Sequence, residues 1–462
     1  MNAPVCIVGA GSSGIVAAKI LAERGIPVEG FELGSDIGGI WRYRNDSGRS
    51  PAYASLRTNT SKHRTAYRCH PVDGPRDFVP NAELLGYFEG FVDRFGVRDH
   101  FRFETEVVGV GEIEGGFRVR TRPRGAGPAD RGGGPVEEHG PYRAVVLAAG
   151  HHWDARMPRL SGSFTGSLIH SRDYRTPTDP VAIAGRRVLV VGIGNSACDI
   201  VCEVAEVADR TLLSTRRGAH VLPKYLLGRP IDQWVTPLSS RLPVDLQAGA
   251  LGLLVSASRG DQRRWGIPRP AHRLGHEHPT LSQDLPRLAA DGRVEVKPDI
   301  ETVDGAAVRF VDGSRADLDA IICATGYHVS FPYLDDALLD RIDPGGAADR
   351  VNGRIRDNRI DLYRHVVSPD CPGLYFLGLV QPLGAIPPLA EAQAEWVADL
   401  LDGSAALPPV EEMRDSMTRT RAGLSRRFVD SSRHTLEVDF FPYLRLMARE
   451  RRHGRRRARG RS

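Results

Sequence analysis

The sequence has few cysteines and no long hydrophobic run. Its 462 residues include six cysteines, none in a CxxC pair, which is too few for a disulfide framework and favours a reducing, cytoplasmic compartment. The best apolar stretch, 248–257, has ten residues, whereas a membrane span needs about 20. No basic segment precedes the first apolar run at Val5, so we expect no signal peptide. These absences predict a soluble protein without a membrane partner.

Motifs of two large enzyme classes are also missing. The histidines at 151–152 and 276–278 do not have the HExxH spacing of a helical zinc site, and no distant Cys or His completes one. No GxSxG sequence occurs, which excludes the common serine-hydrolase arrangement. We therefore expect no metal.

The excess of positive over negative charge is confined to the C-terminal end. The whole chain has a net charge of +5, but residues 449–462 contain eight arginines and one glutamate. The remaining residues are therefore slightly acidic, so nucleic acid is not an expected partner. The composition of 449–462 predicts a disordered, solvated tail.

The N-terminal residues have the pattern of a dinucleotide-binding βαβ unit. A short apolar strand, 5–8, leads into a GxGxxG turn, 9–14, which is followed by a helical pattern and a second strand, 28–33. Such a turn lets the backbone approach a pyrophosphate at a helix N-terminus. Glu32, at the end of the second strand, is placed to accept hydrogen bonds from an adenosine ribose.

A second unit of this kind begins at residue 187. Its strand, 187–191, precedes a turn in which Ala197 replaces the third glycine, and the next strand, 210–213, ends before Arg216 and Arg217 rather than an acidic residue. Basic residues at this position suit the 2′-phosphate of NADP. One charge-assisted hydrogen bond contributes roughly 1.5–3 kcal/mol, so we expect a preference of about tenfold to a hundredfold for NADP over NAD.

With these units, four further motifs make the chain resemble the flavin-containing monooxygenases from residue 5 to about 447. The most specific is FxGxxxHxxxY at 164–174. The others are a GG-x-W turn at 38–41, an ATGY element at 324–327 and a flavin-side segment at 378–386.

The resemblance implies an α/β fold with two Rossmann-like dinucleotide-binding domains, the NADP domain inserted into the FAD domain. The implied FAD domain comprises 1–155 and 318–448, the NADP domain comprises 156–317, and the tail comprises 449–462.

The implied activity is oxygenation of a small molecule with FAD, NADPH and O2. In this family a C4a-hydroperoxyflavin transfers one oxygen atom to a soft nucleophile, an amine nitrogen or a sulfide sulfur. The protein mainly orients the cofactors and excludes water. A homodimer is compatible with this assignment.

The motifs and the resemblance also predict individual site residues. Asn59 and Asn195 would face the flavin, oxygen and nicotinamide, and we call them catalytic. The substrate residues would be Trp396, whose alternative role is core packing, and Tyr225. The predicted cofactor-binding residues are Gly9, Gly11, Ser13, Gly14, Glu32, Gly39, Trp41, Thr60, Val107, Gln381, Gly192, Gly194, Ser196, Arg216, Arg217, Lys224 and Thr325.

The sequence leaves more than one reaction open. Tyr174 ends the FxGxxxHxxxY motif where typical Baeyer-Villiger enzymes carry Trp, which favours heteroatom oxygenation. The alternatives are a Baeyer-Villiger monooxygenase acting on a ketone, an uncoupled NADPH oxidase or flavin reductase, and a non-catalytic dinucleotide sensor.

Overall fold

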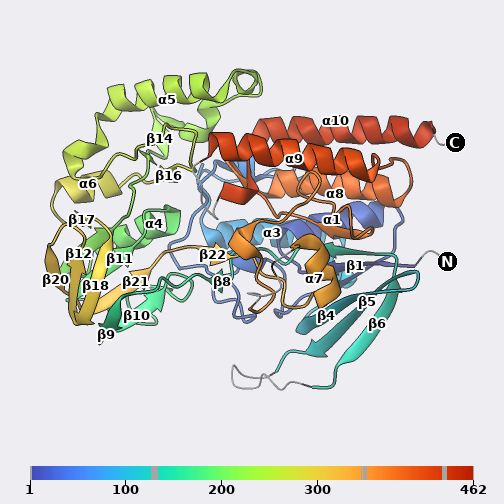
Figure 1. Cartoon of the computed structure of the whole chain (residues 1–462), viewed down its shortest axis with the longest axis horizontal. Helices are drawn as coiled ribbons and strands as arrows, with labels where there is room; N and C mark the ends of the chain where they lie inside the picture. Colours follow the sequence, from blue (N-terminus) through green and yellow to red (C-terminus); the bar gives the residue numbers. More distant parts are fainter. Residues whose placement is uncertain (1–2, 126–133, 345, 347–350, 429–433, 461–462) are drawn as a thin grey trace. The chain divides into compact units, whose positions relative to one another are not determined.

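The computed structural model describes residues 3–125, 134–344, 346, 351–428 and 434–460 (Figure 1). The contacts divide the chain into two compact units. Unit 1 comprises 1–50, 62–154 and 328–462, and unit 2 comprises 51–61 and 155–327. The second unit is thus inserted between segments of the first. Residues 51–61 group with unit 2, whereas the domain bounds expected from the sequence place them in the FAD domain, 1–155.

Unit 1 is built on a five-stranded sheet with the order β23-β7-β1-β2-β3, in which every pairing is parallel. Both faces of the sheet are covered, so its central strands are continuous apolar runs. Alternate residues enter different cores: Ile7 and Val146 lie in one cluster, whereas Cys6 and Val145 lie in the other. The strands are β1 (Val5–Val8), β2 (Val28–Phe31), β3 (Phe101–Arg102), β7 (Ala144–Leu147) and β23 (Leu374–Phe376).

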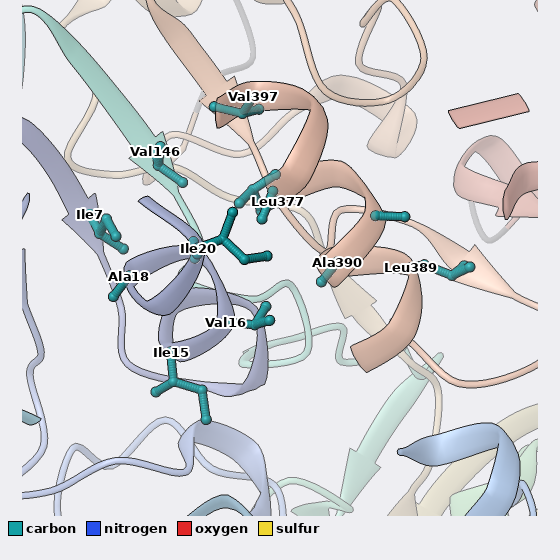
Figure 2. Close-up of a cluster of buried hydrophobic side chains, with 14 of the residues drawn as sticks. Ile7, Ile15, Val16, Ala18, Ile20, Val146, Leu377, Leu389, Ala390 and Val397 are labelled. Carbon is teal, nitrogen blue, oxygen red and sulfur yellow. The ribbon is translucent and has the colours of Figure 1, made fainter. Parts of the chain in front are cut away.

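Two helices from distant parts of the sequence pack together over this sheet. Helix α1 (Ser12–Glu23) directly follows β1, and α8 (Pro387–Leu401) comes from the last third of the chain. Figure 2 shows Val16 of α1 facing Ala390 of α8 in the shared hydrophobic cluster. This packing fixes the N-terminal end of α1 against the sheet.

The rest of unit 1 is an antiparallel sheet and additional helices. The sheet order is β4-β5-β6. These elements are β4 (Thr105–Ile113), β5 (Gly116–Pro123), β6 (Glu137–Tyr142), α2 (Lys62–Thr65), α3 (Asn81–Phe95), α7 (Asp336–Ile342), β24 (Gln381–Pro382), α9 (Val410–Arg427), β25 (Glu437–Val438) and α10 (Phe440–Arg459).

Unit 2 repeats the parallel architecture with the order β10-β21-β11-β12-β17. Helix α4 (Asn195–Val204) follows β11, as α1 follows β1. A second sheet, β20-β19-β18-β9, contributes another core. The α/β class with two Rossmann-like domains, one inserted into the other, is therefore confirmed.

The strands of the two larger sheets of unit 2 are β9 (Gly162–Phe164), β10 (Ser167–His170), β11 (Arg187–Val191), β12 (Arg210–Ser214), β17 (Glu295–Lys297), β18 (Ile300–Gly305), β19 (Ala307–Phe310), β20 (Arg315–Asp317) and β21 (Ala320–Cys323). Its remaining elements include β13 (Val221–Leu222), β14 (Tyr225–Leu226), β15 (Arg229–Pro230), α5 (Val244–Arg259), β16 (Thr280–Leu281) and α6 (Leu285–Ala290).

The prediction of a disordered tail is wrong for residues 449–459, which form the second half of α10. Arg451 donates to the fully buried carboxylate of Asp399 at 2.6 Å and also pairs with Glu395. Arg457 donates to Glu450 at 2.5 Å and to the carbonyl of Ala406 at 2.8 Å. Arginines that look like a solvated run in sequence thus neutralise acidic residues of α8 and α10. Residues 461–462 lie outside the described part of the chain.

Across the described residues, no helix combines the length and the apolar composition that a membrane span requires.

Candidate functional site

A pocket opens in unit 1 at the carboxyl ends of β1, β2 and β7. Parallel sheets bind ligands at this edge. The pocket has a cavity volume of about 130 Å³ and opens to solvent at its mouth. Seven of the predicted cofactor residues line it: Gly9, Gly11, Ser13, Glu32, Gly39, Trp41 and Val107.

The floor of the pocket is the glycine turn between β1 and α1. Gly9 has a φ of +99°, and a Cβ there would lie 2.9 Å from the carbonyl oxygen of Ala148. Gly14 lies behind the turn, where a Cβ would come within 1.9 Å of the carbonyl oxygen of Gly9. The two glycines therefore allow the strand, the turn and the helix to meet closely.

The N-terminal end of α1 points its unsatisfied backbone donors at this pocket. Its N-cap is Gly11, which provides no side-chain cap, and no acidic residue lies in the first turn. Ser12 and Ser13 line the pocket. Free N–H groups and the helix dipole both favour an anion here, so the turn fits the pyrophosphate of FAD.

Glu32 is buried in the pocket wall beside the glycine turn. Its two carboxylate oxygens accept the N–H groups of Ala10 and Gly34, each at 2.7 Å. Burial raises the pKa of Glu32, and these two hydrogen bonds act in the opposite direction. Each oxygen keeps a second lone pair, so the carboxylate can also accept the ribose hydroxyls of FAD.

We expect Glu32→Gln to weaken FAD binding about tenfold, because an amide has only one acceptor oxygen for the two N–H donors. Titration of the apoprotein with FAD, followed by flavin fluorescence, measures this change. The control is Glu114→Gln, at an exposed residue. Equal FAD affinity in both variants would show that the carboxylate has no part in binding.

Several pocket residues were not predicted from sequence. His151 is buried in the wall, and its Nε2 has no hydrogen-bond partner among the described residues. Burial lowers the pKa of His151, and the neighbouring His152 lowers it further, so the ring is neutral. Arg49 lies over the ring of Trp153, 4.6 Å from its centroid, and both residues line the pocket. The unpartnered ring nitrogen fits a polar group of a bound flavin.

Two of the predicted cofactor-binding residues, Gln381 and Thr60, do not line the unit 1 pocket. Gln381 begins β24 and does not line the pocket. Thr60 belongs to unit 2, where its carbonyl accepts the hydroxyl of Thr58 at 2.8 Å. No described group of His, Cys, Asp and Glu residues is arranged to hold a metal ion.

Unit 2 has a second glycine turn of the same design between β11 and α4. Gly192 has a φ of +114°, and a Cβ there would lie 2.5 Å from the carbonyl oxygen of Ala324. Gly194 is the N-cap of α4 and, like Gly11, provides no side chain. Ser196 is in the first turn of the helix. This turn therefore has the backbone geometry that a second pyrophosphate requires.

Asn195 is also in the first turn of α4, but its side chain is engaged. Its Oδ1 accepts the N–H of Leu281 at 2.8 Å, which ties α4 to β16. Asn59 differs, because its buried Oδ1 has no hydrogen-bond partner among the described residues. An orphaned amide oxygen is costly in a folded protein unless a ligand satisfies it. Of the two predicted catalytic residues, Asn59 therefore fits a ligand contact better.

The basic residues predicted for NADP are on the same unit. Arg216 and Arg217 are exposed directly after β12, and no described acidic residue pairs with either. Lys224 is half-buried, and its charge lowers the pKa of Asp199, which burial raises. Thr325 donates to the carbonyl of Arg156. Arg216 and Arg217 are therefore exposed cations in a position to bind a phosphate group.

Trp396, predicted to contact the substrate or else to pack in the core, is fully buried in unit 1. It packs against Tyr363 and does not line the pocket. Its position suits the alternative role, core packing, and its indole Nε1 has no hydrogen-bond partner among the described residues. Tyr225 is exposed in β14.

Residues of the FxGxxxHxxxY motif have structural contacts in unit 2. His170 accepts the N–H of Arg172 at 3.0 Å through Nδ1. Tyr174 is buried and donates to Glu203 at 3.0 Å. The motif therefore fixes the connection that enters the parallel sheet.

Comparisons with known proteins agree with this architecture. The family model of flavin-binding monooxygenase-like proteins matches residues 2–451. The chain is 33% identical to flavin-containing monooxygenase 5 of Rattus norvegicus, over 96% of this chain and 82% of the relative. It is 31% identical to dimethylaniline monooxygenase [N-oxide-forming] 2 of Mus musculus, over 97% and 83%.

Two solved structures have similar folds. S-allyl-L-cysteine S-oxygenase from Allium sativum matches with a TM-score of 0.69 and 25% identity, over 100% of this chain and 92% of that one. Cyclohexanone monooxygenase from Rhodococcus sp. Phi1, bound to NADP+, matches with a TM-score of 0.67 and 19% identity, over 99% and 98%. At 19% identity, the match to cyclohexanone monooxygenase shows similarity of fold alone.

Proposed function

Because the chain belongs to the flavin-binding monooxygenase-like family, and is therefore an FAD-dependent oxygenase that uses NADPH, we propose that it oxygenates an amine nitrogen or a sulfide sulfur of a small molecule. The observation that carries this choice of substrate is the reaction that the names of two similar proteins state. One of 31% identity is N-oxide-forming, and one of 25% identity is an S-oxygenase. Tyr174, in place of the Trp of typical Baeyer-Villiger motifs, also supports a heteroatom substrate.

FAD held in the unit 1 pocket would supply the redox chemistry that links NADPH to O2. The unit 1 pocket holds this cofactor in our proposal. The first turn of α1 binds the pyrophosphate, Glu32 binds the ribose, and the neutral ring of His151 contacts a polar group of the flavin without bringing a charge.

Unit 2 binds NADPH in the same proposal. Gly192, Gly194 and Ser196 form the pyrophosphate turn, and Arg216 with Arg217 binds the 2′-phosphate. Asn59 accepts a hydrogen bond from the nicotinamide carboxamide, which satisfies its orphaned oxygen.

We expect Arg217→Ala, alone or with Arg216→Ala, to reduce the preference for NADPH over NADH by about tenfold to a hundredfold, because a charge-assisted bond to the 2′-phosphate is lost. The ratio of kcat/KM for the two cofactors measures this effect. Arg315→Ala, which removes another exposed arginine of unit 2, is the control. If all variants keep the wild-type ratio, the 2′-phosphate is bound elsewhere.

We expect Asn59→Leu to raise the Kd of NADP+ and the fraction of NADPH lost as hydrogen peroxide, each by about tenfold, because the amide can no longer hold the carboxamide. Peroxide and product are measured in the same reaction. Ala54→Leu changes an exposed position of the same segment and is the control. A normal peroxide fraction in Asn59→Leu would remove Asn59 from the site.

The substrate class is tested with a tertiary amine, a dialkyl sulfide and a cyclic ketone of similar size. We expect NADPH and O2 to be consumed in equal amounts with formation of the N-oxide or sulfoxide. An ester or lactone from the ketone alone would replace the proposal by Baeyer-Villiger oxidation. Stoichiometric hydrogen peroxide with all three would indicate an NADPH oxidase.

A further inference from the structure

Residues 51–61, called the strap below, are attached to unit 2 along helix α4. Tyr53 is buried in the core of unit 2, and its hydroxyl donates to Asp199 at 2.6 Å. The hydroxyl of Ser55 donates to Glu203 at 3.1 Å. The two acidic residues are four positions apart and therefore share one face of α4. The strap thus follows the same helix whose N-terminal end forms the second glycine turn.

The FxGxxxHxxxY motif supports this attachment. Tyr174 ends the motif and donates at 3.0 Å to the oxygen of Glu203 that also accepts the serine hydroxyl of the strap. The ring of Tyr174 makes an edge contact with that of Tyr53, with centroids 6.4 Å apart. The N–H of Ala54 donates to the carbonyl of Arg175 at 2.9 Å. The end of the motif therefore lies against the strap and shares its anchor on α4.

The turn around Asn59 is fixed on both sides. The hydroxyl of Thr58 donates to the carbonyl of Thr60 at 2.8 Å, which closes the turn around the asparagine. Ser61 is fully buried, and both its N–H and its hydroxyl donate to Oδ2 of Asp232, each at 2.8 Å. Hydrogen bonds to a charged carboxylate are stronger than neutral ones. The backbone two positions after Asn59 is therefore held firmly.

Asp232 is itself fixed to the part of unit 2 that carries the predicted NADP residue Lys224. It belongs to the 3-10 helix η3 (Ile231–Trp234), which directly follows β15. The first N–H of η3 donates to the carbonyl of Lys224 at 2.9 Å. The tryptophan indole of η3 donates to the carbonyl of Leu226 at 3.3 Å. The carboxylate is thus placed by short-range contacts within unit 2.

We propose that Asp232 is the positioning residue of Asn59, and that the strap keeps Asn59 on the NADP-binding unit. This inference rests on the proposed function, in which the orphaned Oδ1 of Asn59 accepts the nicotinamide carboxamide. The strap and the second glycine turn are both attached to α4, so their spacing is set within unit 2 and is independent of unit 1. Asp232 acts through Ser61, whose two donors it accepts.

The test compares variants of the holoenzyme by the Kd of NADP+, from flavin absorbance, and by the fraction of NADPH lost as hydrogen peroxide. We expect Asp232→Ala to raise both about fivefold, because the two donors of Ser61 lose their acceptor. Asp232→Asn keeps an acceptor oxygen and should bring both back to within about twofold of the wild type.

Asp312→Ala is the matched control. Asp312 is exposed in unit 2 and accepts the N–H and the hydroxyl of Ser314, at 2.9 and 2.6 Å, just as Asp232 accepts those of Ser61. Its loss should change neither the Kd of NADP+ nor the peroxide fraction.

The double variant Asn59→Leu, Asp232→Ala separates positioning from a general structural role. Because Asp232 acts through Asn59, the double variant should have the same Kd and peroxide fraction as Asn59→Leu alone. Effects that add would overturn the inference and leave the proposed function intact. So would a wild-type Kd in Asp232→Ala when Asn59→Leu is impaired. A wild-type Kd in Asn59→Leu would overturn the inference together with the proposed role of Asn59.

Thermal unfolding and flavin content show whether each variant is folded. If Asp232→Ala does not fold, Ser61→Ala takes its place, because it removes only one of the two hydrogen bonds to Asp232. Ser61→Ala should raise the Kd of NADP+ about twofold, and it should have no effect when Asn59→Leu is already present. An unchanged Kd in Ser61→Ala and Asp232→Asn alike would overturn the proposal.

Discussion

The Gly14→Ala variant should purify without its yellow flavin, with FAD affinity reduced by at least about a hundredfold. The added Cβ would lie 1.9 Å from the carbonyl oxygen of Gly9, a backbone atom of the turn that lines the pocket. Only a shift of α1 away from β1 can relieve this contact, and that shift opens the turn that binds pyrophosphate. Overpacking of this kind costs about 1–3 kcal/mol before any ligand contact is lost. The absorbance ratio of flavin to protein after purification measures the result.

Gly86→Ala is the matched control, because Gly86 is also a helical glycine but a Cβ added to it would have no other atom within 4 Å. Alanine there should leave FAD bound and stabilise the fold by about 0.5–1 kcal/mol through its higher helix propensity. A thermal unfolding curve distinguishes loss of FAD from loss of folding in Gly14→Ala. A yellow Gly14→Ala protein with normal FAD affinity would show that the close contact of helix and turn does not support the site.

The parallel sheets and their glycine turns could be predicted because local sequence dictates them. Val5–Val8 and Arg187–Val191 are apolar strands that end directly at glycines, and a strand, a turn and a helix in this order form a unit whatever the rest of the chain does. The acidic residue at the end of β2 follows from the same rule. These features account for most of the predicted residues that line the pocket.

Residues whose role depends on distant partners could not be predicted in this way. The arginines after residue 449 look solvated in sequence because Asp399 and Glu395 are about 50 positions away. His151 is notable only once burial and its unpartnered nitrogen are known. Residues 51–61 join unit 2 through contacts such as the hydrogen bond from Tyr53 to Asp199, 2.6 Å long, which no local pattern indicates.

Loss of a single arginine from α10 should destabilise unit 1. Asp399 is fully buried and accepts hydrogen bonds from Arg451 at 2.6 Å and from Arg24 at 2.8 Å. Removing one partner of a buried ion pair costs about 3–5 kcal/mol when the other charge is left alone. Because Arg24 and Arg455, which donates to Asp399 at 3.3 Å, remain in Arg451→Ala, we expect a loss of about 2 kcal/mol in the free energy of unfolding. Urea unfolding measures it, provided that the transition is two-state.

The loss should depend on pH in a way that identifies Asp399. Burial alone would raise the pKa of Asp399, but the hydrogen bonds from Arg451 and Arg24 outweigh it, so the pKa is lowered. A lowered pKa stabilises the fold above the unfolded value of about 4, and this contribution is lost as the pH falls through the folded pKa. The wild type and Arg451→Ala should therefore converge below about pH 4. Arg452→Ala, which removes an exposed neighbour, should match the wild type at every pH. Equal stability of Arg451→Ala and Arg452→Ala near neutral pH would mean that the end of α10 does not hold Asp399 in solution.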